Sequence, residues 1–210
     1  MTTVPSNQRY IHEEYARMKH AIRERLFDFT TVPQEEYFYE LCYCICTPQS
    51  KAVSAFAVVE ELKRFDFEHT DIDVVPLLRS PSHYIRFHNT KARNLIGLKT
   101  VYPTVKETLI STISPVEKRD VLVSLIRGVG MKEASHFMRN IGYRELCIID
   151  RHILKHLYRC GVIDSLVFPS SKKKYLDMEH RWKQFAHDIR IPVDELDLLF
   201  WSLETGEILK

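Results

Sequence analysis

Residues 125–137 read LIRGVGMKEASHF and place two glycines, Gly128 and Gly130, between two amphipathic segments. Before the glycines, apolar residues at 121, 122, 125 and 126 follow one helical face, and after them those at 134, 137, 138 and 141 do the same. Glycine allows positive φ and leaves no side chain over the backbone. The stretch therefore predicts two helices joined by a tight Gly-x-Gly turn.

The predicted turn has the properties of a phosphate site. We expect Gly128, Val129 and Gly130 to offer backbone N–H groups at the positive end of the second helix, where phosphates bind. Lys132 lies in the first turn of that helix. The helix dipole disfavours a second positive charge there and favours the neutral, nucleophilic amine. Two interpretations stay open at this point, because most lysines are simply solvated surface residues.

Asp150 stands directly before another predicted helix, in which Ile153, Leu154, Leu157 and Tyr158 share one face. An aspartate in this position is usually an N-cap. A carboxylate held by backbone N–H groups can also stabilise a developing positive charge, so the two interpretations are compatible. Lys132 and Asp150 are 150 − 132 = 18 residues apart, which is enough for a helix and a returning loop to bring both into one cleft.

Composition sets bounds on the class of protein. The 210 residues are 45% apolar and 28% charged, as in ordinary globular proteins, and they can form one or two small domains. The net charge of +2 means that any DNA-binding face must be a local patch. The sequence contains no run of 18 apolar residues, so it predicts no membrane span. The polar N-terminal segment lacks the apolar core of a signal peptide. We therefore expect a cytoplasmic protein.

Five cysteines, an odd number without a signal peptide, indicate reduced thiols rather than disulfides. Three of them form the pattern Cys42-Tyr43-Cys44-Ile45-Cys46, in which Cys44 would point away from the other two on a helix. This spacing favours buried apolar side chains over a metal site. No cluster of four cysteines lies near the C-terminus, so we expect neither an iron–sulfur cluster nor another cofactor.

The remaining apolar patterns predict an all-α fold. We expect further helices at about 8–27, 33–47, 50–65, 89–102, 151–160, 170–189 and from 192 onward. In the helix at 50–65, Val53 and Phe56 are expected to face inward, as is Ile96 in the helix at 89–102. Pro103 is expected to interrupt the chain after that helix. No alternating pattern predicts a strand.

Four stretches carry a resemblance to a known family. They are CTPQSKA at 46–52, IRFHNTKA at 85–92, the hairpin through Asp150, and LFW at 199–201 with the terminal Lys210. The chain resembles the helix–hairpin–helix DNA glycosylase superfamily that includes endonuclease III. More narrowly, it resembles the second, compact type of 8-oxoguanine DNA glycosylase/AP lyase, found in archaea and some thermophilic bacteria. It departs from the superfamily at Ile149, where a proline often stands, and in lacking the iron–sulfur ligands.

The resemblance implies an organisation and an activity. It implies one glycosylase unit over residues 1–210 with two helical subdomains, one from about 1–30 and 150–210 and the other from about 31–149, and an active-site cleft between them. It also implies a monomeric enzyme, with no metal ligands among its site residues, that flips 8-oxoguanine out of duplex DNA. A lysine would then cleave the N-glycosidic bond through a Schiff base, and β-elimination would nick the strand.

The resemblance also implies roles for individual residues. Lys132 would attack C1′ of the damaged nucleoside, and Asp150 would activate the lysine and stabilise positive charge on the sugar. The other implied sites are duplex probing at Gln49, contact with the flipped base at Trp201 and Lys210, and phosphate binding at Gly128, Val129 and Gly130. From their place in a turn that leads into a helix, Arg86, Asn89 and Lys91 are candidates for contact with the DNA backbone or the opposite strand. Met131, next to Lys132, is a candidate for the base pocket. Without the resemblance, Gln49 is equally a polar turn residue, Trp201 a core aromatic, and residues 86–91 a capped surface turn.

Two other functions remain open on the sequence alone. One is a cluster-free glycosylase/lyase that acts on another oxidised base. The other is a non-catalytic helix–hairpin–helix module that binds duplex DNA in a salt-dependent way. Lys132 argues against the second, because a phosphate anchor requires the turn but not that lysine.

Overall fold

The structure is a computed structural model that describes residues 6–208, with the side chains of residues 6 and 7 left out. Lys210, which is expected to contact the flipped DNA base, lies outside the described residues. Within the described range all regular structure is helical, which confirms the all-α prediction. The contacts divide the chain into two compact units, one comprising residues up to 31 and from 138 onward, the other residues 32–137. None of the described helices is long and apolar enough to cross a membrane.

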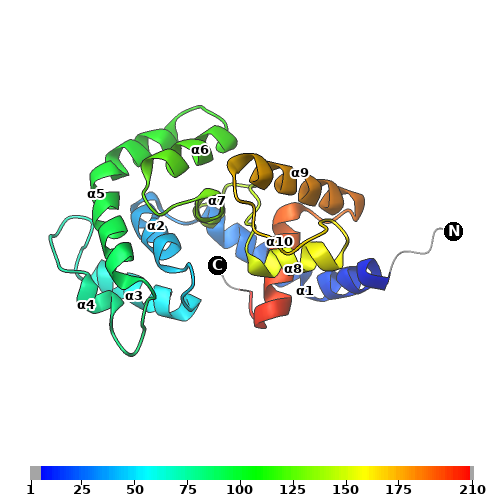
Figure 1. Cartoon of the computed structure of the whole chain (residues 1–210), viewed down its shortest axis with the longest axis horizontal. Helices are drawn as coiled ribbons and strands as arrows, with labels where there is room; N and C mark the ends of the chain where they lie inside the picture. Colours follow the sequence, from blue (N-terminus) through cyan, green and yellow to red (C-terminus); the bar gives the residue numbers. More distant parts are fainter. Residues whose placement is uncertain (1–5, 209–210) are drawn as a thin grey trace. The chain divides into compact units, whose positions relative to one another are not determined.

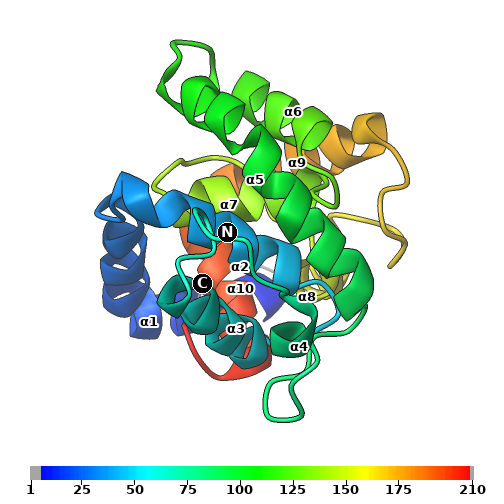
Figure 2. The ribbon, with the colours of Figure 1, turned by 90° about the vertical axis from the view of Figure 1, so that its left-hand side faces the viewer.

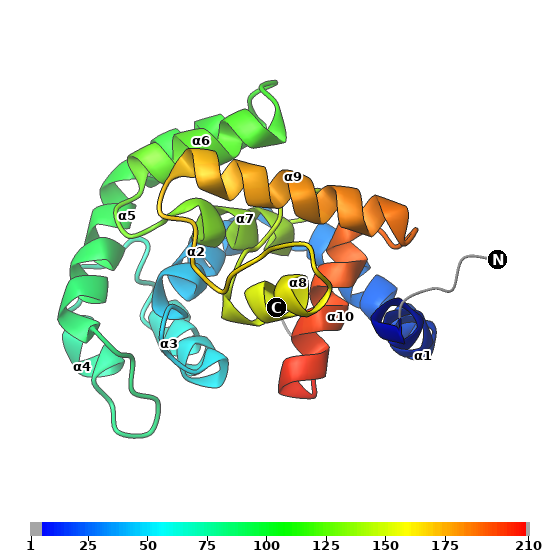
Figure 3. The same cartoon turned by 45° about the vertical axis from the view of Figure 1, so that its right-hand side comes forward.

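The first unit is built around its last helix. It contains α1 (Ser6–Thr30), the end of α7 (Met131–Asn140), α8 (Arg151–Arg159), α9 (Lys172–Asp188) and α10 (Val193–Thr205). Helix α10 packs against α1, α8 and α9 (Figures 1 and 3), and every residue from 193 to 200 is buried. Its central position explains its apolar stripe, because three neighbouring helices exclude water from it. This unit carries Asp150 and Trp201.

The second unit contains η1 (Gln34–Glu36), α2 (Tyr37–Cys46), α3 (Ala52–Arg64), α4 (Val75–Leu78), α5 (His88–Ile110), α6 (Pro115–Leu125) and the first part of α7. Helix α2 packs against both α3 and α5, and α5 also packs against α4 and α6 (Figure 2). Phe38 on α2 is fully buried and makes edge-to-face contact with Tyr102 on α5, at a centroid separation of 5.0 Å. This unit carries the glycine turn and Lys132.

The cysteine pattern of α2 belongs to the core. Cys42, Cys44 and Cys46 are all fully buried. Burial raises the pKa of Cys46 to about 12 and that of Cys42 well above its ordinary value, so both thiols stay protonated and behave as small apolar groups. In the part of the chain that the structure describes, no group of three histidine, cysteine or acidic side chains is arranged to hold a metal ion.

Some inward-facing assignments made from the sequence are wrong. Val53 and Phe56 on α3 are 67% and 52% exposed, because the buried face of that helix is formed by the residues at 55, 58, 59 and 62. Ile96 on α5 and Tyr158 on α8 are also about half exposed. In each case another set of residues at i, i+3, i+4 spacing packs against the neighbouring helices, and the apolar side chain next to it is left at the surface.

Two boundaries also differ from those expected. Helix α5 continues through Pro103 to Ile110, since Tyr102 and Val105 on either side of the proline are buried and their packing outweighs the lost helix hydrogen bond. The division between the two units falls inside α7, after residue 137, and therefore earlier than the expected position near 149. The segment from 138 to Asp150 packs with the first unit, where Gly142 (φ +94°) ends α7 against Phe29 and Thr30.

Candidate active site

The turn between α6 and α7 requires glycine at residue 128. Gly128 has a φ of +85°, a region that other residues rarely adopt. A Cβ atom on this residue would lie 2.1 Å from Nδ2 of Asn94 on α5. The close approach of Asn94 and the positive φ both exclude a side chain. The structure thus confirms the helix–turn–helix hairpin predicted from the two glycines.

The backbone N–H groups of the turn are arranged differently from the expectation. The N–H of Val129 donates to the carbonyl of Ile126 at 3.2 Å, and that of Gly130 donates to Oε2 of Glu133 at 3.2 Å. Two of the three groups expected to hold a phosphate are therefore used inside the hairpin. The first turn of an α-helix generally leaves N–H groups without intrahelical acceptors, and such groups are suited to contact an anion.

Lys132 leaves this same first turn, as predicted. Its side chain is 25% exposed, and Nζ lies 3.6 Å from Oε1 of Glu133. The Glu133 carboxylate thus contacts both the Gly130 N–H and the Lys132 amine, and it supplies negative charge at the positive end of α7. Met131 is half-buried beside it. Glu133 was not singled out from the sequence, although a glutamate three residues after the expected start of a helix is a known capping signal.

Asp150 caps α8, as predicted. Its Oδ1 accepts hydrogen bonds from the backbone N–H groups of His152 at 2.8 Å and Ile153 at 2.9 Å. Its backbone is extended, which is the usual N-cap conformation. These two bonds fix the carboxylate at the positive end of α8, and they make it a rigid negative charge.

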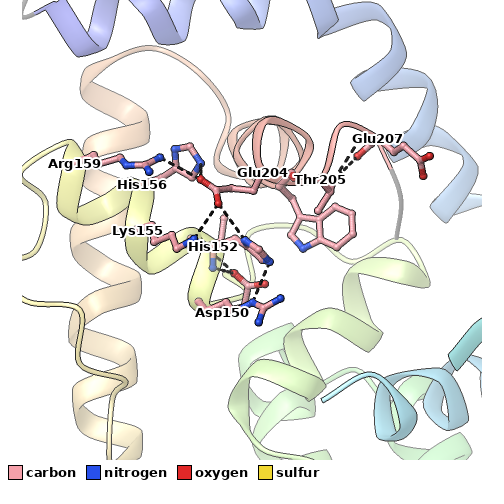
Figure 4. A network of polar contacts seen from close by, with 11 residues as sticks. Asp150, His152, Lys155, His156, Arg159, Glu204, Thr205 and Glu207 are labelled. Atoms are coloured by element: carbon pink, nitrogen blue, oxygen red, sulfur yellow. Dashed lines mark hydrogen bonds and ion pairs between the residues drawn. The ribbon is translucent and has the colours of Figure 1, made fainter. Parts of the chain in front are cut away.

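A network centred on Glu204 of α10 lies next to this cap (Figure 4). Oε2 of Glu204 lies 3.2 Å from Nζ of Lys155 and 3.4 Å from Nδ1 of His152, and its Oε1 lies 3.1 Å from Nη1 of Arg159. The His152 ring also meets the Trp201 ring edge-on at 6.4 Å between centroids. His152 therefore connects the Asp150 cap with Trp201, which is half-buried. Neither His152 nor Glu204 was identified from the sequence, since the link between them exists only once α8 and α10 pack together.

A buried ion pair lies on α7 and α10 of the same unit. Asp197 accepts a hydrogen bond from Nη1 of Arg139, and both side chains are at most 8% exposed. Burial raises the pKa of Asp197 to about 7; Arg139 acts against this rise and the charge of Asp150 adds to it. Asp150 thus belongs to a site in which several carboxylates interact electrostatically.

The residues expected to contact duplex DNA fall into two groups. Gln49, Arg86 and Asn89 are exposed on the second unit. Gln49 lies in the turn between α2 and α3, Arg86 in the loop before α5 and Asn89 in the first turn of α5. Lys91 is different, because it is only 5% exposed and its Nζ donates to the carbonyls of Cys46 and Pro48. The Lys91 ammonium group is thus bonded inside the protein, whereas the other three side chains face solvent.

The fold and these residues define a class: a helix–hairpin–helix protein with a lysine in the first helical turn beyond its glycine turn and a capped aspartate on a later helix. A family profile described as 8-oxoguanine DNA glycosylase matches residues 22–191. The chain belongs to this family.

Relatives and solved structures support the same assignment. The chain is 35% identical over 212 residues to the 8-oxoguanine DNA glycosylase/AP lyase of Fusobacterium nucleatum, covering 95% of this chain and 96% of the relative. It is 33% identical to the enzyme of the same name from Methanocaldococcus jannaschii, covering 93% and 94%.

Two crystal structures cover nearly the whole chain. The 8-oxoguanine DNA glycosylase of M. jannaschii superposes with a TM-score of 0.86 at 32% identity, covering 97% of this chain and 95% of that one. The M. jannaschii glycosylase/lyase in complex with a 15mer DNA containing 8-oxoguanine gives a TM-score of 0.84 at 31% identity, covering 97% and 99%.

Proposed function

We propose that this protein is a bifunctional base-excision repair enzyme that removes 8-oxoguanine from duplex DNA and then nicks the strand. The observation that carries the proposal is Lys132 in the first turn of α7, directly after a turn in which Gly128 leaves no room for a side chain. Membership in the 8-oxoguanine DNA glycosylase family supports the choice of lesion. The relatives that bear the name glycosylase/AP lyase support the second, strand-cutting step.

In the proposed reaction, the neutral amine of Lys132 attacks C1′ of the flipped nucleoside through its Nζ atom. A bond forms between Nζ and C1′ while the glycosidic bond breaks, and the base leaves with the bonding electrons and takes up a proton. Opening of the sugar ring gives a protonated Schiff base. Loss of a C2′ proton then expels the 3′ phosphate, and water releases the lysine from the cut product.

Asp150 is proposed to stabilise the positive charge that develops on the sugar as the base departs. Two backbone hydrogen bonds hold its carboxylate before the substrate arrives, so little reorganisation is needed during the reaction. The half-buried Trp201 is proposed to stack on the flipped base, and Met131 and the terminal Lys210 to contact it. His152, whose ring meets Trp201, would keep the indole in one orientation.

The remaining proposed roles concern the intact duplex. Gly128, Val129 and Gly130 form the phosphate anchor together with the first turn of α7, in which incoming phosphate displaces the Glu133 carboxylate from the Gly130 N–H. Gln49 probes the base stack, and Arg86 and Asn89 contact the backbone or the opposite strand. Since its substrate is chromosomal DNA, we propose that the enzyme works at the nucleoid in the cytoplasm, and as a monomer.

A panel of lesion duplexes tests this function. Each duplex carries one lesion, either 8-oxoguanine, an oxidised pyrimidine or another damaged purine, opposite each of the four bases. We expect release of free 8-oxoguanine followed by a strand cut, and neither event with Lys132→Gln. Efficient release of another base, with 8-oxoguanine left in place, would replace the proposed substrate. Duplex binding without cutting on every member of the panel would show a binding module instead.

A further inference from the structure

Lys91 is a buried lysine that holds one particular turn. It lies in the first turns of α5, and its Nζ donates to the carbonyl of Cys46 at 2.7 Å, to the carbonyl of Pro48 at 2.6 Å and to Oγ of Ser50 at 3.2 Å. An ammonium group has three N–H donors, so all three can be used. Every acceptor belongs to the segment from Cys46 to Ser50, which joins α2 to α3.

Ser50 extends this contact to a second loop. Its Oγ accepts from the Lys91 ammonium and also from the backbone N–H of Arg86 at 3.0 Å. Arg86 lies in the loop that leads into α5. The turn at 47–50 and the loop at 84–88 are therefore held together through one lysine and one serine, which we call the Lys91–Ser50 clamp.

The clamp encloses a residue with an unfavourable backbone conformation. Gln49 is exposed and has a φ of 56°, and its neighbours on either side, Pro48 and Ser50, both accept hydrogen bonds from Lys91. On the second loop, Phe87 is exposed with a φ of 60°. Left-handed conformations are costly for residues other than glycine and persist only where surrounding contacts impose them. The clamp supplies such contacts on both sides of Gln49.

We propose that the Lys91–Ser50 clamp positions Gln49 and the loop at 84–88 for interrogation of paired DNA, so that Lys91 is a positioning residue for lesion recognition and not a DNA contact. This role rests on the proposed function. Pre-setting the two loops removes the need to order them when DNA binds, which is the usual gain from a rigid recognition surface.

The cost of burying a charge supports a specific role for this lysine. Burial lowers the pKa of Lys91 to about 8; Lys132 and Arg86 nearby also lower it, while Glu133 and the Cys46 thiol act in the opposite direction. A methionine of similar length would fill the same space without this desolvation cost. It could not, however, donate to the two carbonyls and the hydroxyl that define the turn around Gln49.

Lys91→Met tests the proposal, and Lys99→Met is its matched control. Lys99 lies on the same helix and also ties a loop, through bonds from its Nζ to the carbonyl of Thr70 at 2.7 Å and to Asp71 at 3.0 Å, and these partners lie outside the segment 46–50. Two substrates are compared for each variant: a duplex with 8-oxoguanine opposite cytosine, and a duplex with an abasic site, which contains no damaged base to recognise.

We expect Lys91→Met to lower the single-turnover rate of 8-oxoguanine excision by about ten- to a hundredfold, as loss of positioning does, and to lower borohydride trapping on the abasic duplex far less. Lys99→Met should change neither rate appreciably. Equal losses in the two variants, or an equal loss on both substrates in Lys91→Met, would overturn the proposal, because both results indicate a general loss of structure. Ser50→Ala should show a smaller loss of the same kind, and it replaces Lys91→Met as the test variant if Lys91→Met does not fold.

Amide hydrogen exchange tests the clamp independently of any enzymatic activity. The N–H groups of Ser50 and Arg86 are bonded within the clamped loops, at 2.9 Å to the Thr47 carbonyl and 3.0 Å to the Ser50 hydroxyl. Their exchange should accelerate about tenfold or more in Lys91→Met and stay unchanged in Lys99→Met. Unchanged exchange in Lys91→Met would disprove the clamp. A wild-type protein inactive on both substrates would instead refute the proposed function, and the exchange result would still decide whether the clamp exists.

Discussion

Asp150 combines two roles that substitution can separate. As an N-cap it stabilises α8, and as a fixed carboxylate it is proposed to stabilise charge on the sugar. Asparagine caps helices about as well as aspartate but carries no charge. The neutral variant therefore keeps the structural role and loses the proposed chemical one.

We predict that Asp150→Asn slows release of 8-oxoguanine by roughly a hundredfold or more, the usual effect of removing one electrostatic group from a transition state. The free energy of unfolding should change by less than about 1 kcal/mol, because the cap remains. Single-turnover excision and urea unfolding measure the two effects. Asp150→Ala is the control, expected to lose about 1 kcal/mol of stability as well. Wild-type excision by the asparagine variant would show that Asp150 is only a cap.

Glu133 places a negative charge at the proposed phosphate anchor. Its carboxylate accepts a hydrogen bond from the Gly130 N–H and lies 3.6 Å from the Lys132 amine. These two positive groups would also attract a phosphate oxygen, so the carboxylate occupies the position that the phosphate would take. Glutamine can still accept a hydrogen bond from the Gly130 N–H, as it does at the third position of a capping box, but it does not repel phosphate.

We predict that Glu133→Gln binds duplex DNA about two- to tenfold more tightly at low salt, because one like charge is removed from the anchor. Fluorescence anisotropy against a salt series measures the affinity. Glu107→Gln removes the same charge from an exposed position on α5 and should change affinity much less. Weaker binding by Glu133→Gln would mean that the carboxylate shapes the turn for DNA instead of competing with it.

Among the elements, the hairpin makes the strictest demand on its sequence. Gly128 combines a positive φ with a separation of only 2.1 Å between the position that a Cβ atom would take and Nδ2 of Asn94. Gly97 on α5 lies within the helix and has nothing within 4 Å of the corresponding position. Adding one methyl group at each position therefore has opposite consequences.

We predict that Gly128→Ala lowers the free energy of unfolding by about 1–3 kcal/mol, through strain and the collision with Asn94, and weakens DNA binding. Gly97→Ala should raise it by about 0.5–1 kcal/mol, because alanine favours the helix. Urea denaturation of both variants gives the comparison. A Gly128→Ala variant as stable as the wild type would contradict the geometry described for the turn.

The helices themselves could largely be predicted from apolar spacing, and the faces of some of them could not. The hairpin, the Asp150 cap and the glycine end of α7 follow from local rules on glycine and capping residues. Val53 and Phe56 were placed wrongly because α3 offers two apolar faces and only packing against α2 selects one. The helix at 89–102 was expected to end before Pro103, but burial of Tyr102 and Val105 outweighs the tendency of proline to end a helix.

At the scale of the whole molecule, one buried histidine links stability to pH. His156 on α8 is 8% exposed and stacks on Phe200 of α10 at 4.4 Å between ring centroids. Burial lowers the pKa of His156 to about 4, from 6.5 for the free side chain. Between these two pH values the unfolded chain binds a proton at this residue and the folded chain does not. The contribution of His156 to stability is therefore complete above pH 6.5 and is lost as the pH falls toward 4.

We predict that the wild-type protein loses on the order of 2 kcal/mol more stability than His156→Gln when the pH is lowered from about 6.5 to about 4. Chemical denaturation at a series of pH values gives the free energy of unfolding of both proteins. Titration of the carboxylates affects the two proteins equally, so it cancels from the difference between them. His20→Gln, at a highly exposed site on α1, should keep the wild-type slope. Parallel pH profiles for wild type and His156→Gln would exclude this linkage.

What the sequence could not supply were contacts between elements far apart in the chain. Lys91 looks like a surface lysine at the start of a helix, and only the fold brings its ammonium to the carbonyls 43 and 45 positions earlier. Glu204 likewise meets α8 across 52 positions. The catalytic candidates could be identified from the sequence because Lys132 and Asp150 lie in local motifs. The residues that support them could not, because their contacts depend on tertiary packing.

Borohydride trapping tests most directly whether Lys132 is the nucleophile. The protein is incubated with an 8-oxoguanine duplex in the presence of borohydride, which reduces a Schiff base to a stable covalent bond, and the attachment site is mapped by peptide mass spectrometry. We predict an adduct at Lys132 in the wild type and in the control Lys106→Gln, and none in Lys132→Gln. An adduct that persists in Lys132→Gln, or a wild-type protein that forms none, would contradict the proposed chemistry.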